Sequence, residues 1–268
     1  MRWIIGDIHG MLGPLETLLR AVDAADDEAE ILFLGDYINR GPDSALVVET
    51  LLALPDCRCI RGNHDDIFDL VVNRECYAPH PTASDPMAAM RWFLEHGLDK
   101  TMLSYGADPE QIERFIEKPD ERRMAQLVSL VPAHHKRFFR SLPPAIDEHD
   151  FFMVHATWPP DERTESPGVA MRLRSDARLR HNALWGRYSD AEVHRRKAWQ
   201  RTGFFGHTPV NNYPSAQQTG LAAPLVGPQA VLLDTGCALG TAGRLTAFCV
   251  ETRTFLQSDH FGNLIDED

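Results

Sequence analysis

Six side chains that could bind metal ions each follow a short apolar run of the sequence: Asp7, His9, Asp36, Asn63, His155 and His207. Carboxylate, imidazole and amide ligands without a thiolate suit manganese, iron or zinc better than calcium. Two such ions about 3.5–4 Å apart can share a hydroxide and hold the oxygens of an in-line phosphoryl displacement. These residue types therefore predict a site for two divalent ions, in which the Asp36 carboxylate could bridge both.

The four candidate ligands between positions 7 and 63 lie in three sequence segments that share one pattern. In each segment an apolar run leads into a polar cluster with glycine, and an amphipathic stretch follows. The runs are 3–5, 31–34 and 57–60, and helices are expected over 12–22, over 43–54 and from the third cluster to about 72. Such βα units predict parallel strands, and ligand sites in open α/β sheets lie beyond the carboxyl ends of those strands.

The rest of the chain is expected to alternate between helix and strand in blocks. Residues 73–150 predict a helical insertion that covers one end of the sheet. Strand-like runs return at 151–154, 203–205, 230–233, 245–250 and 254–257, and the last two resemble an antiparallel pair. Proline, glycine and alanine are frequent over 213–228, which predicts a surface loop.

Composition and charge limit the classes of function. The 268 residues carry a net charge of −12, so no nucleic-acid partner is expected, and an anionic substrate must be attracted by local cations. No apolar run approaches the length of a membrane span, so no membrane partner is expected. Five cysteines without zinc-binding spacing, and an N-terminus without a secretory pattern, predict a cytoplasmic protein with reduced thiols. The oligomeric state is not predicted.

Three short motifs carry a family resemblance. They are GDIHG at 6–10, GDYINRG at 35–41 and GNHD at 62–65, followed in order by MVHA around His155 and FGHTP around His207. The chain resembles the calcineurin-like metallophosphoesterases, and within them the phosphoprotein phosphatase family. Its connecting segments resemble bacterial serine/threonine phosphatases most. The resemblance implies one α/β domain over 1–268, a four-layer α-β-β-α sandwich with two mixed sheets and the helical insertion.

The resemblance also implies a role for each site residue. Asp7, His9 and Asp36 would hold the first metal, and Asp36, Asn63, His155 and His207 the second. Manganese is the expected metal, with iron or zinc as alternatives. Arg40 and Arg187 would bind phosphoryl oxygens, because a guanidinium fork matches their geometry. His64 would protonate the leaving oxygen while a hydroxide held by the metals attacks phosphorus.

Asn39 departs from the family pattern, which usually has an aspartate before Arg40. An asparagine can orient His64 but cannot stabilise its imidazolium with a negative charge, so a weaker acid role is expected. Asp43 or Asp65 could supply that charge instead. The symmetrical diadenosine tetraphosphatases, a sister group, also lack this aspartate and carry GNHD.

The leading expectation is hydrolysis of phosphoserine or phosphothreonine monoesters, with a phosphorylated protein or a small phosphoester as partner. Dinucleoside polyphosphate hydrolysis is the first alternative and cyclic phosphodiester hydrolysis another. A non-catalytic scaffold that binds phosphate is the alternative outside enzymes. The remaining histidines are expected at the surface or as caps, and Trp92 and Trp185 are expected to serve packing rather than base stacking.

Overall fold

The computed structural model describes residues 1–268 except 163, 165–167, 218–221 and 266–268. The N-terminal part forms the three expected βα units: β1 (Arg2–Ile5), α1 (Leu12–Ala25), β2 (Glu30–Phe33), α2 (Ser44–Ala53), β3 (Arg58–Cys59) and α3 (Asn63–Asn73). The three strands pair in parallel, in the order β1-β2-β3. Their carboxyl ends therefore meet at one edge, where the three polar clusters follow.

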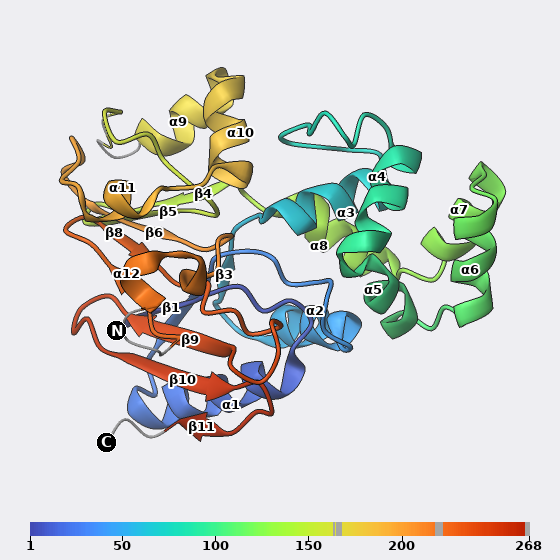
Figure 1. The fold of residues 1–268 in the computed structure, drawn as a ribbon. Coiled ribbons are helices and arrows are strands. Elements are labelled where there is room, and N and C mark those ends of the chain that lie inside the picture. Colours follow the sequence, from blue (N-terminus) through green and yellow to red (C-terminus); the bar gives the residue numbers. More distant parts are fainter. Residues whose placement is uncertain (163, 165–167, 218–221, 266–268) are drawn as a thin grey trace.

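A block of helices follows α3 and extends to one side of the sheets (Figure 1). It contains α4 (Pro86–Phe93), a π-helical turn over Leu94–Leu98, α5 (Asp99–Ser104), α6 (Pro109–Glu117), α7 (Glu121–Val128) and α8 (Ala133–Ser141). The predicted range 73–150 is helical only as far as Ser141, because β4 (Ala145–Asp147) already belongs to a sheet. This three-residue strand was too short to stand out in the sequence.

The second half of the chain builds a second sheet and completes the first. The second sheet has the order β4-β5-β6-β8-β7, with β5 (Phe151–Val154), β6 (Thr202–Phe205), β7 (Leu225–Val226) and β8 (Ala230–Leu232). The helical elements of this half are α9 (Gly168–Ser175), α10 (Ala177–Trp185), α11 (Asp190–His194), the 3-10 turn Val210–Asn212 and α12 (Pro214–Gln217). The first sheet gains β9 (Arg244–Cys249), β10 (Phe255–Asp259) and β11 (Leu264–Ile265) beside β1, and β9 and β10 are the expected antiparallel pair.

Alternating side chains of the strands fill separate cores, and this creates the layers. On β1, Ile4 packs between the two sheets, whereas Trp3 and Ile5 pack against α1, α2 and the helical block. On β5, Phe151 joins the core between the sheets, and Phe152 faces the core beneath α9 and α10. The predicted α/β sandwich with two mixed sheets and outer helices is therefore confirmed (Figure 1).

The surface loop predicted over 213–228 is only partly correct. It contains α12 and β7, which pairs antiparallel with β8, while 218–221 lie outside the described residues. In the described part of the chain, no helix combines the length and hydropathy that crossing a bilayer requires.

Candidate active site

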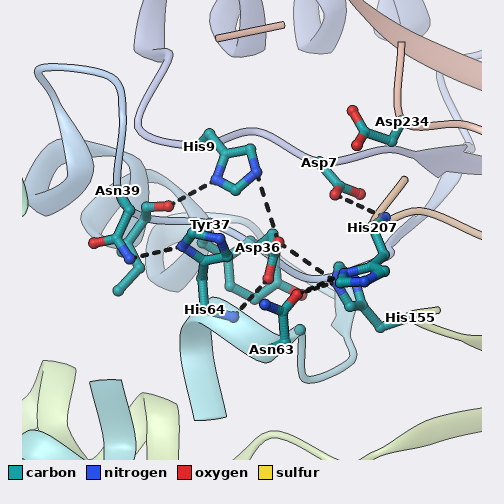
Figure 2. A network of polar contacts seen from close by, with 12 residues as sticks. Asp7, His9, Asp36, Tyr37, Asn39, Asn63, His64, His155, His207 and Asp234 are labelled. Atoms are coloured by element: carbon teal, nitrogen blue, oxygen red, sulfur yellow. Dashed lines mark hydrogen bonds and ion pairs between the residues drawn. The ribbon is translucent and has the colours of Figure 1, made fainter. Parts of the chain in front are cut away.

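The six predicted metal ligands converge beyond the carboxyl ends of five parallel strands (Figure 2). The Nε2 atoms of His9 and His155 lie 3.6 Å and 3.4 Å from Asp36 Oδ2. Asn63 Oδ1 lies 3.0 Å from His155 Nε2 and 2.8 Å from His207 Nδ1. All of these side chains are buried. Two groups of potential ligands are His9/Asp36/His64 and Asp36/His155/His207. Within each group the potential ligand atoms all lie within 4.8 Å of one another.

Backbone carbonyls orient two of the imidazoles. His9 Nδ1 donates to Ile38 O at 2.9 Å, and His155 Nδ1 donates to Leu34 O at 2.8 Å. Each contact directs the other ring nitrogen, Nε2, toward Asp36. A hydrogen bond from the remote nitrogen to a carbonyl is the usual support for a metal-binding histidine.

Two glycines make room for the carboxylates. A Cβ on Gly206 would lie 2.0 Å from Asp7 Oδ1, and a Cβ on Gly62 would lie 2.2 Å from Asp36 Oδ1. Only glycine therefore lets the loop after β6 and the start of α3 approach these oxygens. The backbone N–H of His207 donates to Asp7 Oδ2 at 2.9 Å, which joins the loops of the two sheets.

Several polar atoms of the site are buried without a hydrogen-bond partner among the described residues, namely Asp7 Oδ1, His207 Nε2 and Asp234 Oδ2. An unpaired buried carboxylate oxygen is costly, so such atoms call for a ligand. Divalent cations would satisfy both the oxygens and the imidazole nitrogen. The residues present therefore supply the kinds of donor atom that a metal centre needs.

The electrostatics of the site show the same need for positive charge. Burial, together with the negative charge of Asp234, raises the pKa of Asp7 well above its usual range. Burial acts in the same direction on Asp36, but the neighbouring His155 and His64 outweigh it, and the pKa of Asp36 is lowered. Burial lowers the pKa of His155, but Asp36 reverses this and raises it to about 10. The ionised form of a carboxylate in this site is thus favoured only where positive charge lies close by, as it does for Asp36.

Asp234 belongs to this cluster, although the sequence did not single it out as a site residue. It follows β8, is buried, and its charge acts on Asp7 (Figure 2). Burial raises the pKa of Asp234 to about 6. An aspartate at the end of a strand is the signal that identified Asp7 and Asp36, and the same signal was available here.

The predicted phosphate-binding arginines and the predicted acid line one pocket with the metal ligands. This pocket has a volume of about 310 Å³, and its lining includes Arg40, His64, Arg187, Asp36 and His207. Arg187 is exposed, and its Nη1 donates to Thr208 Oγ1 at 3.1 Å. Its guanidinium is therefore accessible to a ligand that enters the pocket.

Asn39 contacts His64 as expected, and Thr101 fixes its orientation. The Thr101 hydroxyl donates to Asn39 Oδ1 at 2.8 Å, so the amide nitrogen Nδ2 faces His64 Nδ1 at 2.8 Å. With this orientation His64 accepts at Nδ1 and carries its ring proton on Nε2. Burial is the main reason that the pKa of His64 is lowered well below its usual value.

Asp65 does not replace the missing carboxylate beside His64. Its two oxygens accept hydrogen bonds from the backbone N–H groups of Asp36 and Gly62, each at 2.8 Å, and of Tyr37 at 3.2 Å. Asp65 thus fastens the loop after β2 to the first turn of α3. The expectation that it could supply charge to His64 is not supported by these contacts.

Aromatic and imidazole side chains form a second wall of the same pocket, which the sequence analysis missed. They are His80, Trp92, Phe93, His96, His181 and Trp185. They come from α4, from the loop before it, from the turn after it and from α10. His96 is exposed, as expected, and Trp92 and Trp185 pack on neighbouring rings, as expected. What the sequence analysis did not predict is that these residues line the active-site pocket. His135, also expected at the surface, is buried beside Tyr105.

Comparison with known proteins agrees with this architecture. A family model described as calcineurin-like phosphoesterase matches residues 2–211. A symmetrical bis(5'-nucleosyl)-tetraphosphatase of Bordetella pertussis is 40% identical over 65 residues, which is 24% of each chain. One of Legionella pneumophila is 41% identical over 64 residues, 24% of this chain and 23% of the relative. The chain thus aligns with only about a quarter of the length of these relatives.

Two solved structures share the fold. A crystal structure provisionally described as a diadenosine tetraphosphatase has a TM-score of 0.55 and 21% identity, covering 96% of this chain and 92% of its own. A metallophosphoesterase from Sphaerobacter thermophilus has a TM-score of 0.50 and 16% identity, covering 100% and 89%. With the family model spanning most of the sequence, and with buried histidine and aspartate clusters at the strand ends, this chain belongs to the calcineurin-like phosphoesterase family.

Proposed function

We propose that this chain is a metal-dependent hydrolase of dinucleoside polyphosphates, with diadenosine tetraphosphate as the model substrate. The observation that carries the proposal is the contact between the amide of Asn39 and His64 Nδ1, at 2.8 Å. The expected serine/threonine phosphatase activity becomes the competing outcome of the test below. Both readings use the same metal ligands and differ in the group that leaves.

The leaving group decides how much acid catalysis is needed. A serine alkoxide is about as basic as hydroxide, whose parent water has a pKa of about 15.7, so it needs a proton as it departs. A phosphate oxygen has a second pKa of about 6 and leaves as an anion. A neutral His64 that lacks a carboxylate partner suits the second case, because its Nε2–H can donate a hydrogen bond without transferring a proton.

Asp7, His9 and Asp36 would hold one ion, and Asp36, Asn63, His155 and His207 the other, with manganese as the proposed metal. Bound there, divalent ions would activate water and neutralise the charge that develops on the phosphoryl oxygens. Arg40 and Arg187 would orient those oxygens bidentately. With two divalent ions, two arginines and the carboxylates of Asp7 and Asp36, the pocket would be locally positive despite the net charge of −12.

The names of the partial relatives support the same substrate class. The matched proteins of Bordetella pertussis and Legionella pneumophila are described as symmetrical bis(5'-nucleosyl)-tetraphosphatases. The short matched stretch alone does not carry their activity to this chain. It adds to the argument from Asn39 and His64, which rests on this chain's own residues.

A substrate panel tests the proposal. Purified protein with added manganese is assayed on diadenosine tetraphosphate, a phosphoserine peptide and p-nitrophenyl phosphate, and its metal content is measured. We expect the highest kcat/KM on the dinucleotide and about two ions per chain. In Asp36→Asn, activity and bound metal should fall together, because Asp36 faces both ligand groups.

Two results would overturn the proposal in different ways. A much higher kcat/KM on the phosphopeptide would restore the serine/threonine phosphatase reading. Absence of metal-stimulated hydrolysis of every substrate, with the metal bound, would indicate a phosphate-binding scaffold. Glu49→Gln is the matched control, because Glu49 lies in a separate group with His134 and His135 on α2 and α8.

A further inference from the structure

We infer that the aromatic wall of the active-site pocket is a nucleobase-binding subsite, formed mainly by Trp92, Trp185 and His80. This inference rests on the proposed function, since it names the part of the substrate that this wall recognises. The wall contains none of the predicted metal ligands or arginines, although it lines the same pocket. It is built by α4 and the loop before it on one side and by α10 on the other.

The rings of the wall pack on one another, most of them near-parallel, although His80 and Trp185 are tilted by 45° at 4.6 Å. The centroids of His80 and Trp92 are 4.5 Å apart with planes inclined by 21°, and those of Trp92 and Trp185 are 5.8 Å apart with planes inclined by 24°. His181 continues the series at 6.2 Å from His80, inclined by 22°. These four side chains are partly exposed and line the pocket, so the ring surface that no neighbouring ring covers borders the cavity. Open aromatic faces are the surfaces on which unpaired bases stack.

The wall is fixed in place by its own contacts. Trp185 Nε1 donates to Ala78 O at 3.4 Å. Trp92 packs edge-to-face on Phe93 at 5.0 Å, and Phe93 packs in the same way on His64 at 4.9 Å. A rigid aromatic surface lowers the entropic cost of holding a ring. The chain of contacts also connects the wall directly to the catalytic side of the pocket.

The imidazole edges favour a heterocyclic base over the phenol ring of a phosphotyrosine. His80 Nδ1 accepts from Thr82 N–H at 3.2 Å, which leaves a proton on Nε2. His96 Nδ1 donates to Trp92 O at 2.9 Å. Within the described residues, the second nitrogens of His80 and His96 and both nitrogens of His181 have no hydrogen-bond partner. A nucleobase can use these groups through its ring nitrogens and exocyclic atoms, whereas a phenyl ring cannot.

The position of the wall suits a base joined to a phosphate chain. Trp185 lies edge-on to His207, a predicted metal ligand, with ring centroids 6.4 Å apart. Arg187 follows Trp185 by two residues, and both line the pocket that contains Arg40. One cavity thus combines a cationic end for phosphates with an aromatic end for a planar polar ring. A phosphopeptide would leave the aromatic end unused.

Paired inhibitors test the subsite without relying on dinucleotide hydrolysis. Inhibition of p-nitrophenyl phosphate hydrolysis is measured with ADP, which carries a base, and with inorganic pyrophosphate, which does not. We expect the wild-type protein to bind ADP at least about tenfold more tightly than pyrophosphate. Stacking of one base on an aromatic side chain contributes about 1–3 kcal/mol, and about 1.4 kcal/mol corresponds to a tenfold change in affinity. In Trp92→Leu and Trp185→Leu this preference should shrink several-fold, while the inhibition constant for pyrophosphate stays unchanged.

Conservative and remote variants separate stacking from folding. Trp92→Phe and Trp185→Phe keep an aromatic face and should retain most of the preference for ADP. Phe261→Leu removes a ring that is 69% exposed on the turn between β10 and β11, and should change neither constant. Equal binding of ADP and pyrophosphate by the wild-type protein would overturn the subsite, even if diadenosine tetraphosphate is cleaved. A preference for ADP in a protein that does not cleave the dinucleotide would instead overturn only the proposed function.

Discussion

A single amide stands where the family pattern has a carboxylate, and its consequence can be measured. In Asn39→Asp, the new carboxylate would accept a hydrogen bond from the Nδ1–H of His64 and stabilise the imidazolium. We expect kcat on a phosphoserine peptide to rise about tenfold relative to kcat on diadenosine tetraphosphate, a fraction of the roughly 10²–10⁴-fold that general acid catalysis contributes. The measurement is the ratio of the two rates in the variant and the wild type.

Asn39→Ala provides the control for that prediction. It removes the contact between Nδ2 and His64 Nδ1 without adding charge, so it should slow both reactions and leave their ratio near the wild-type value. An unchanged ratio in Asn39→Asp would mean that proton donation by His64 does not limit either reaction. The argument from the leaving group would then be lost.

Side chains at strand ends could be predicted from the sequence, because each follows an apolar run in a short recognisable motif. His9 and Asp36 are in such positions, and the structure brings their side chains together. Asp7 is in such a position too, and its carboxylate accepts a hydrogen bond from the backbone of His207. Trp92 and Trp185 could not be placed in the same way. Their helices follow polar segments of irregular length, and helical periodicity does not specify which distant helix a given face will meet.

Among the elements, the turn between α4 and α5 positions Arg40. Gly97 in this turn has φ +93°, and a Cβ there would lie 2.3 Å from the backbone N of Arg40. That N–H donates to Gly97 O at 3.3 Å, and Arg40 itself has a left-handed φ of 69°. The helical block therefore touches the backbone of Arg40, a predicted phosphate-binding residue, directly.

Gly97→Ala should displace Arg40 and lower kcat/KM by about 100-fold, as expected for misplacing a binding group by about 1 Å. Gly106→Ala is a matched control, because Gly106 has a similar φ of +87° but nothing within 4 Å of its Cβ position. The left-handed φ alone should cost each variant about 1–2 kcal/mol of folding free energy, and only Gly97→Ala adds the clash with Arg40. If Gly97→Ala and Gly106→Ala lost equal activity, backbone strain rather than the clash with Arg40 would explain the loss.

The buried guanidinium of Arg61, just before α3, forms ion pairs with two aspartates of α3 and donates a hydrogen bond to the backbone of α8. Arg61 Nη1 lies 2.8 Å from both Asp66 Oδ1 and Asp69 Oδ2, and Nη2 donates to Phe139 O at 2.6 Å. Arg61→Met would leave two carboxylates buried without their cation. We expect unfolding free energy to fall by about 3–5 kcal/mol in urea denaturation.

Arg74→Met is the comparison for that measurement. Arg74 pairs with Glu121 at 2.8 Å, but the two side chains are 62% and 67% exposed. Exposed pairs contribute about 0–1 kcal/mol, so this variant should unfold close to the wild type. If Arg61→Met were as stable as Arg74→Met, the buried pair would not be what holds α3 and α8 together.

The periodicity of the sequence predicted the elements of the sandwich better than the boundaries of the helical block. The strands β5, β6, β8 and β9 were expected close to their observed positions because each is a largely apolar run whose residues are nearly all buried. The short strands β4, β7 and β11 were missed, since two or three residues cannot display an alternating pattern. Their pairing depends on the neighbouring strand, which a local pattern does not contain.

For the whole molecule, the candidate metal centre joins the two sheets. Asp7, His9, Asp36 and Asn63 follow strands of the first sheet, whereas His155 and His207 follow strands of the second. Burial, together with the negative charge of Asp234, raises the pKa of Asp7, and several buried polar atoms of the site have no hydrogen-bond partner among the described residues. Metal binding should therefore stabilise the fold as well as the reaction.

That coupling predicts a large effect of metal removal on the melting temperature. An ion present at 100 times its dissociation constant contributes about 2.7 kcal/mol, which for a chain of this size corresponds to about 5–10 °C per ion. Calorimetry of wild-type protein should show a decrease of this order with EDTA and recovery with manganese. Asp36→Asn should melt lower from the start and respond much less to either treatment. Glu49→Gln, which alters only the separate cluster on α2 and α8, should respond like the wild type. A melting temperature that is indifferent to EDTA, in protein shown by elemental analysis to have lost its metal, would mean that the two sheets are held together by the core between them alone.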